Sequence, residues 1–332
     1  MTLYGNVMTA MVTPFNDDLS LNERGVHELA RYLVREGSDG LIVCGTTGES
    51  PTLSFDEKIA MFRIVREAVG NDVPVWAGTG SNDTAAAVAL TRAAEDVGAD
   101  GVLVVTPMYN KPPQEGLYQY FRTVANATRL PVMVYNVPGR TGINLLPETI
   151  ERLLDVPNIA AVKEAAGSLD QVAEIALRCG AMGGCMDPSR PLAGTSFVAS
   201  ASHGSRVNVR DCGPDIGKTR PFYIYSGDDS LTLPMLTNGA VGVVSVASHV
   251  VGPQMKKMVT AFMDGRTREA AQIHLRLFPV FKALFAVSNP ILVKAALQLR
   301  GLPVGPLRSP LVEATSAERD KLRRVLQDAG VL

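Results

Sequence analysis

The sequence lacks an excess of charge of either sign, since 32 lysines and arginines nearly balance 33 aspartates and glutamates and leave a formal net charge of −1. Proteins that bind nucleic acid or anionic membranes by electrostatics carry a basic excess, so the balance argues against both partners. The chain also lacks an apolar run approaching the roughly 20 residues of a membrane helix, and its first residues show no basic segment ahead of an apolar one. We therefore expect a cytoplasmic globular protein.

Metal-binding patterns are missing as well. The four cysteines form no C-x-x-C pair, and the four histidines are scattered along the chain. These spacings predict neither a zinc site nor a disulfide framework, which fits a reducing compartment. The residues concerned are Cys44, Cys179, Cys185, Cys212, His27, His203, His249 and His274.

Short apolar runs alternate with helical patterns over residues 1–265. The runs are nearly continuous, which is typical of parallel strands covered on both faces, and segments such as 23–36 and 83–97 show helical periodicity. Eight such units predict a (β/α)₈ TIM barrel, an α/β fold, rather than an open doubly wound sheet. The eight runs are 7–13, 40–45, 73–79, 101–106, 131–136, 159–163, 222–227 and 241–247.

Two regions depart from this alternation. Beyond residue 265 the strand pattern stops and three helical patterns follow, so we expect a C-terminal helical domain over residues 266–332. Residues 181–219 are rich in Gly, Ser, Pro and Arg and show no periodicity, and we interpret them as an irregular insertion between the sixth helix and the seventh strand. A helix-to-strand connection lies at the N-terminal face of a barrel, away from an active site.

Polar side chains follow five of the predicted strands, at the end of a TIM barrel where catalytic residues lie. Each has a structural explanation by itself, as a turn, a helix cap, a rim aromatic or an ion pair of Lys163 with Glu164. Their coincidence at five strand ends predicts an active site. The segments are G-T-T-G-E-S (45–50), T-P-M-Y-N (106–110), Y-N-V-P-G-R-T (135–141), Lys163 and S-G-D-D (226–229).

Lys163 ends an apolar strand, although lysine is rarely found fully buried. Removing an amine from water disfavours its charged form and leaves a nucleophile that can condense with a ketone. A phenol one strand away could supply the proton transfers that an imine needs. The threonines and backbone N–H groups of residues 45–48 could hold a small carboxylate. The residues thus predict Schiff-base chemistry on a 2-oxo acid.

Several motifs resemble those of the dihydrodipicolinate synthases, within the pyruvate-dependent class I aldolase superfamily. The match covers nearly the whole chain apart from residues 181–219 and is most specific at G-T-T-G-E-S, T-P-x-Y-N-K-P-x-Q-E-G-L-Y, Y-N-V-P-G-R-T, V-K-E-A and S-G-D-D. The resemblance implies a lyase that condenses pyruvate with L-aspartate 4-semialdehyde in diaminopimelate and lysine biosynthesis. It implies no cofactor.

The resemblance also assigns catalytic roles by position. Lys163 is then the Schiff-base lysine, Tyr135 the general acid and base, and Thr46 the hydroxyl that links Tyr135 to Tyr109. In this family the tyrosine at the position of Tyr109 reaches into the active site of a neighbouring subunit. The resemblance therefore implies a homodimer that pairs into a homotetramer.

Substrate contacts follow from the same positions. Thr47 and Val244 correspond to pyruvate contacts, and Gly227 lies beside the site. Arg140 corresponds to the residue that receives the carboxylate of the semialdehyde, for which a guanidinium fork is well shaped.

Two alternatives stay open from the sequence. N-acetylneuraminate lyase and the 2-keto-3-deoxy sugar acid aldolases share the lysine and the tyrosine, but their second substrate is a polyol, against which Arg140 argues. The chain could also be a catalytically inactive paralogue that binds a metabolite. A turnover assay separates the second alternative from an enzyme.

Feedback inhibition by lysine is expected to be weak or absent. In lysine-sensitive members of the family the inhibitor's pocket holds a glutamate where Ala86 stands and a tyrosine where Met108 stands, so the anion for the inhibitor's ammonium group is missing here. Lys58 adds a like charge that disfavours a cationic ligand. Initial rates measured over a lysine titration test this, and strong inhibition at low lysine concentration would refute it.

Overall fold

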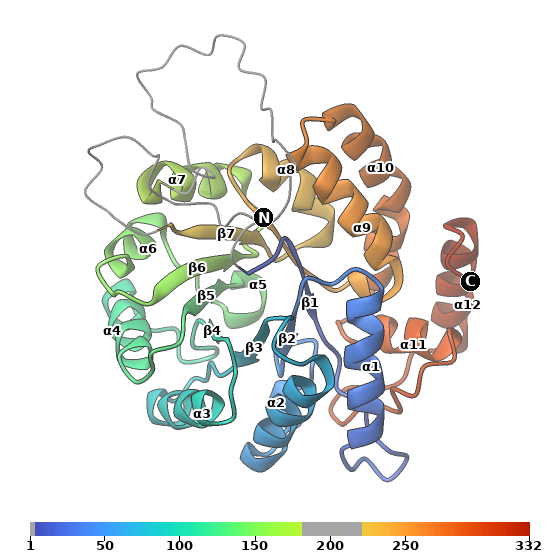
Figure 1. Ribbon diagram of the computed structural model, residues 1–332, viewed down its shortest axis with the longest axis horizontal. Coiled ribbons are helices and arrows are strands. Elements are labelled where there is room, and N and C mark those ends of the chain that lie inside the picture. Colours follow the sequence, from blue (N-terminus) through green and yellow to red (C-terminus); the bar gives the residue numbers. More distant parts are fainter. Residues whose placement is uncertain (1–3, 181–220) are drawn as a thin grey trace.

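Eight parallel strands close into a barrel in the computed structural model, which describes residues 4–180 and 221–332 (Figure 1). Each strand pairs with the next along the chain, and the last pairs with the first. The predicted TIM barrel is therefore confirmed. The strands are β1 (Val7–Ala10), β2 (Gly40–Val43), β3 (Val75–Gly78), β4 (Gly101–Val105), β5 (Val132–Asn136), β6 (Ile159–Glu164), β7 (Tyr223–Ser226) and β8 (Gly242–Ser245).

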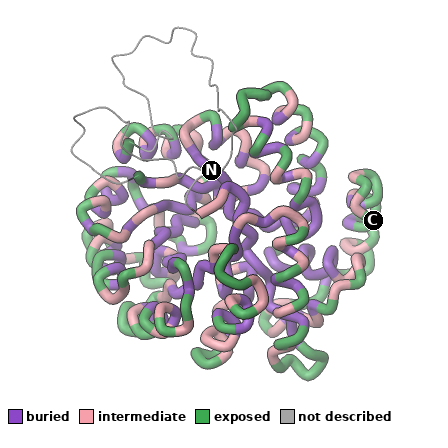
Figure 2. The backbone as a smooth tube through the Cα atoms, in the orientation of Figure 1, coloured by how far each residue is buried: buried purple, intermediate pink, exposed green. Residues whose placement is uncertain are grey.

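Helices surround the barrel, and Figure 2 shows buried strands within a ring of helices whose outer faces are exposed. The two segments with the clearest predicted periodicity are helical, and both begin at a side-chain cap: Asn22 accepts a hydrogen bond from Gly25 N, and Asp83 accepts one from Ala85 N. The helices up to β8 are α1 (Glu23–Arg35), α2 (Phe55–Val69), α3 (Thr84–Asp96), α4 (Gln114–Ala125), α5 (Pro138–Thr141), α6 (Pro147–Leu153), α7 (Leu169–Cys179) and α8 (Thr232–Thr237).

The alternation of side chains along each strand separates two layers of core. One buried cluster fills the inside of the barrel and includes Trp76, Met133, Tyr135 and Ala161, and the other lies between strands and helices. Because Lys163 is two residues beyond Ala161 on β6, it shares the inward face. Glu164 points to the opposite face.

After β8 the chain continues as α9 (Ser248–Met263), α10 (Thr267–Leu284), α11 (Ile291–Leu299) and α12 (Ser316–Asp328). The last three confirm the predicted C-terminal helices, and their buried apolar side chains belong to the same cluster as the outer layer of the barrel. Residues 181–219 lie outside the described residues. The division into a barrel over residues 1–265, an insertion at 181–219 and a helical domain over 266–332 stays a prediction. None of the helices described is long and apolar enough to cross a membrane.

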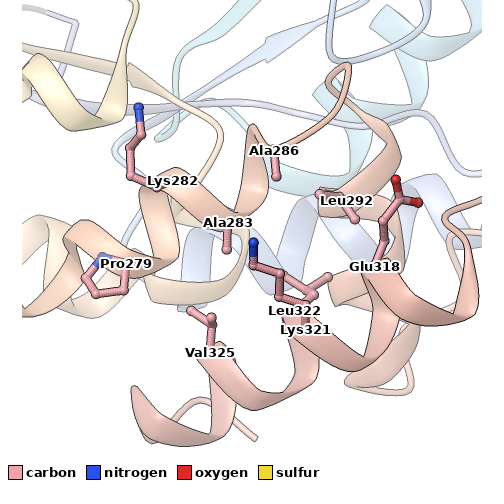
Figure 3. A pocket seen from close by; sticks show the side chains of 9 residues that line it. All are labelled: Pro279, Lys282, Ala283, Ala286, Leu292, Glu318, Lys321, Leu322 and Val325. Atoms are coloured by element: carbon pink, nitrogen blue, oxygen red, sulfur yellow. The ribbon is translucent and has the colours of Figure 1, made fainter.

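A pocket of about 170 Å³ lies among the C-terminal helices (Figure 3). Its lining includes the apolar side chains of Leu292, Leu322 and Val325. Lys282 and Lys321 also line it. Its walls come from α10, α11, α12 and the turn after α10, so it contains no residue from the ends of the barrel strands.

A buried ion pair joins the C-terminal helices to the barrel. Lys294 on α11 is 1% exposed, and its ammonium group donates hydrogen bonds to Glu49 Oε1 (2.9 Å), Thr13 O (3.0 Å) and Pro306 O (2.6 Å). The second carboxylate oxygen of Glu49 accepts a hydrogen bond from Arg308 N at 3.0 Å. Glu49 follows β2, so this contact fixes the loop after β2 against α11.

Breaking this ion pair on one side should destabilise the protein. Lys294→Met leaves the carboxylate of Glu49 buried without its counter-ion, and we expect a loss of about 3–5 kcal/mol in the free energy of unfolding, measured by denaturant titration. The double variant Lys294→Met/Glu49→Gln, which buries no unpaired charge, should recover part of that loss. A Lys294→Met protein as stable as the parent would contradict this account.

Candidate active site

Lys163 lies at the C-terminal end of β6 with its side chain inside the barrel, where the residue is only 6% exposed. Its register partner on β5 is Tyr135, and Lys163 Nζ lies 4.1 Å from the centroid of the Tyr135 ring. Among residues 4–180 and 221–332, Lys163 forms no ion pair and donates no hydrogen bond to an acceptor. The amine is thus surrounded by protein but has no counter-ion.

Burial has a large effect on the ionisation of Lys163. Loss of solvent lowers the pKa of Lys163 to about 7, the carboxylate of Asp229 opposes this decrease, and the charge of Arg140 adds to it. Burial also lowers the pKa of Lys294, but there the charge of Glu49 and its hydrogen bond favour the ammonium form. Near neutral pH a large fraction of Lys163 is therefore an uncharged nucleophile, whereas Lys294 is held in an ion pair.

Tyr135 places a phenol beside this amine. Burial raises the pKa of Tyr135, while the charge of Arg140 and a hydrogen bond with the side chain of Thr46 act in the opposite direction. The phenol is thus protonated at neutral pH, and its ionisation is influenced by the side chain of Thr46. A protonated phenol next to an amine can give a proton to an oxygen that leaves the reacting carbon, and can recover the proton later.

The loop after β2 carries Thr46 and Thr47 to this side of the barrel. Backbone hydrogen bonds from Gly48 N to Gly45 O (3.0 Å) and from Glu49 N to Thr46 O (3.1 Å) hold it in a tight turn. Thr47 is buried, and its Oγ1 accepts a hydrogen bond from Asn289 Nδ2 at 2.9 Å. Asn289 comes from the segment between α10 and α11 and does not follow a strand, so the pattern of polar residues at strand ends does not predict it.

The ends of β7 and β8 complete the surroundings of the amine. Gly227 N donates to Glu164 O at 2.8 Å, and a Cβ on Gly227 would lie 3.2 Å from Lys163 Cε and 2.7 Å from Ala165 Cβ. Only glycine therefore lets β7 end so close to the lysine. Val244 is buried in the cluster that fills the barrel and that also contains Tyr135.

Asp229 belongs to the site and lies within the S-G-D-D segment, whose sequence pattern predicts no role for it. Its buried carboxylate accepts hydrogen bonds from Ser245 Oγ (2.5 Å), Val246 N (3.0 Å) and Ala247 N (2.8 Å), and burial raises its pKa to about 6. It is the only negative charge that shifts the pKa of Lys163 among the described residues. A strand-end aspartate is also a common helix cap, so sequence alone could not separate the two roles.

Arg140 and Tyr109 lie at the surface of the single chain. Arg140 is exposed, and its Nη2 donates to Asn289 O at 3.4 Å. Tyr109 is 88% exposed with a φ of 75°, and among the described residues its side chain forms no hydrogen bond with Thr46. The contribution of Tyr109 to a neighbouring subunit's site stays a prediction. The described residues contain no group of three or more His, Cys, Asp or Glu side chains that could hold a metal ion.

The chain is similar throughout its length to known proteins. A model of the dihydrodipicolinate synthetase family matches residues 3–187 and 215–329. The 4-hydroxy-tetrahydrodipicolinate synthase of Desulforamulus reducens is 52% identical over 99% of this chain and 98% of its own, and that of a Cyanothece species is 50% identical over the whole of both chains. A solved dihydrodipicolinate synthase from Cyanidioschyzon merolae, with lysine bound, is 43% identical with a TM-score of 0.85 and covers 99% of each chain. The resemblance read from the motifs is thus confirmed.

The ionisation of Lys163 can be measured by competitive labelling with acetic anhydride, which reacts with the neutral amine only. Because burial lowers the pKa of Lys163 to about 7, its labelling should rise with pH through a midpoint near 7. Lys294, whose ammonium has three acceptors, should stay unlabelled in the folded protein. A midpoint for Lys163 near 10.5, the ordinary value of lysine, would contradict this description of the site.

Proposed function

The chain belongs to the dihydrodipicolinate synthetase family, and on this premise we propose that it condenses pyruvate with L-aspartate 4-semialdehyde to give 4-hydroxy-tetrahydrodipicolinate in lysine and diaminopimelate biosynthesis. The observation that carries the proposal is Lys163, a buried amine without a counter-ion and with a pKa near 7, next to the phenol of Tyr135. The cytoplasmic location expected from the sequence belongs to the same proposal.

The reaction starts when the neutral amine of Lys163 attacks the ketone carbon of pyruvate. Tyr135 donates a proton to the carbonyl oxygen, water leaves from the resulting carbinolamine, and an imine forms between Lys163 Nζ and the former ketone carbon. In this proposal Thr46, whose side chain interacts with the phenol of Tyr135, passes the proton onward. Thr47 and Val244 border the bound pyruvate, with the hydroxyl of Thr47 toward its carboxylate.

Carbon–carbon bond formation follows from the imine, which makes the adjacent methyl group acidic. The phenolate left on Tyr135 takes a proton from this methyl group, and the product is an enamine. The enamine carbon attacks the aldehyde of the semialdehyde, and Tyr135 returns the proton to the aldehyde oxygen. Arg140 binds the carboxylate of this second substrate with its planar guanidinium. The amino group of the semialdehyde then attacks the imine carbon, closes the ring and releases the amine of Lys163.

We assign Tyr109 to the active site of a partner subunit, in a homodimer that pairs into a homotetramer. The exposure of Tyr109 supports this, since 88% of a large aromatic residue would otherwise face water. The hydroxyl of Thr46 is then the link between Tyr135 of one subunit and the incoming tyrosine. Gly227 keeps its role of leaving room for Lys163.

A coupled turnover assay tests the proposed reaction. The product of the condensation is reduced in a second reaction, and the rate of that reduction is measured. We expect turnover with pyruvate and L-aspartate 4-semialdehyde and none with N-acetylneuraminate or 2-keto-3-deoxy sugar acids, because Arg140 suits a carboxylate and not a polyol. Turnover of a sugar acid alone would assign the chain to the related aldolases. Pyruvate binding without any turnover would make it an inactive metabolite-binding paralogue.

Arg140→Ala should impair the reaction with the semialdehyde but not the binding of pyruvate. Because the arginine serves the semialdehyde, reductive trapping of pyruvate should stay near the parent level while turnover falls by about 100-fold or more, as expected for loss of a charge-assisted bidentate contact. Arg152→Ala is the matched control, since Arg152 lies on α6 in a surface ion pair with Glu115. Equal losses of trapping and turnover in Arg140→Ala would show that its role is misassigned.

A further inference from the structure

Asn289 reaches the candidate site from the far end of the chain. It lies just before α11, is 6% exposed, and donates from Nδ2 to Thr47 Oγ1 at 2.9 Å. Its other amide atom, Oδ1, is buried without a hydrogen-bond partner in the described chain. A buried amide oxygen without a partner is costly, so this side chain is not placed for its own stability.

The hydrogen bond from Asn289 determines whether the hydroxyl of Thr47 can donate a hydrogen bond to a ligand. A hydroxyl group has one proton to donate and two lone pairs that accept. Since Asn289 Nδ2 fills one lone pair of Thr47, the hydroxyl proton is not used in this contact and stays available for a ligand. If Asn289 accepted instead, that proton would be consumed within the protein and Thr47 could not donate it to an anion.

We propose that Asn289 is a positioning residue that keeps the hydroxyl of Thr47 as a hydrogen-bond donor for the carboxylate of the 2-oxo acid substrate. The inference rests on the proposed function and adds a residue to it. Asn289 acts through Thr47 and takes no part in the bond-making steps. It makes the segment before α11 part of the pyruvate site.

Two further contacts hold Asn289 in place independently of its side chain. Lys294, five residues further on, is tied to Glu49, which is two residues beyond Thr47. Arg140 Nη2 donates to the backbone carbonyl of Asn289 at 3.4 Å. A substitution of the Asn289 side chain therefore leaves the attachment of the segment and the contact with Arg140 intact. Its effect should be confined to pyruvate.

The test compares Asn289→Asp, which can only accept hydrogen bonds when ionised, with Asn289→Ala and with a matched control. In Asn289→Asp the carboxylate takes the proton of Thr47 and repels the substrate anion, so the KM for pyruvate should rise by about 10- to 100-fold with little change in the KM for the semialdehyde. This increase relative to the parent should shrink as the pH is lowered, because a protonated carboxyl can again donate to Thr47. Asn71→Asp, an exposed site before β3, should behave like the parent.

A double-mutant cycle shows whether Asn289 acts through Thr47, and it remains informative if Asn289→Asp fails to fold. Asn289→Ala should raise the KM for pyruvate in the parent and add nothing in a Thr47→Val background. An unchanged KM for pyruvate, an equal rise in both KM values, or additive effects of the two substitutions would overturn the proposal. Failure of the parent protein itself to use pyruvate would instead contradict the proposed function.

Discussion

The site depends on one electrostatic asymmetry: a lysine that is removed from water without receiving a counter-ion. Desolvation disfavours the ammonium form of any buried lysine, and the usual response of a fold is to supply a carboxylate. The chain does this for Lys294, which meets Glu49 and two carbonyl oxygens. It does not do so for Lys163, which faces the ring of Tyr135. The same residue type is therefore a structural cation in one place and an amine without a counter-ion in the other, which is the lysine that we propose as the nucleophile.

The surrounding structure limits how far the pKa of Lys163 is lowered. Asp229 favours the charged form of Lys163 from a position where its own oxygens are occupied by Ser245, Val246 and Ala247. Burial without a nearby negative charge would lower the pKa of Lys163 further than a nucleophile at neutral pH requires. A direct ion pair would instead keep the amine charged and unreactive. A carboxylate held by other partners gives an intermediate outcome, with a pKa of about 7.

Local patterns in the sequence predict the fold and the centre of the site because both follow from short-range regularities. Apolar runs of strand length and amphipathic helical periods identify the eight strands and the helices between them, and the rule that catalytic groups follow strands brings Lys163, Tyr135 and Thr46 together. Asn289 could not be found in this way, since it meets Thr47 across 242 residues and lies in a helical region. The ion pair of Lys294 with Glu49 spans 245 residues and escapes local patterns for the same reason. Contacts of this kind are set by how the C-terminal helices pack on the barrel, and no spacing in the sequence encodes that.

The central claim is that Lys163, among the lysines of residues 4–180 and 221–332, is the one that combines burial with a free amine. It is tested most directly by trapping the imine and locating it. The protein is incubated with pyruvate, reduced with borohydride, digested and mapped by mass spectrometry. We predict one adduct per chain, on Lys163, with Lys294 unmodified although it is at least as deeply buried. An adduct on Lys294 or Lys111, or none at all under conditions where the enzyme turns over, would contradict the account.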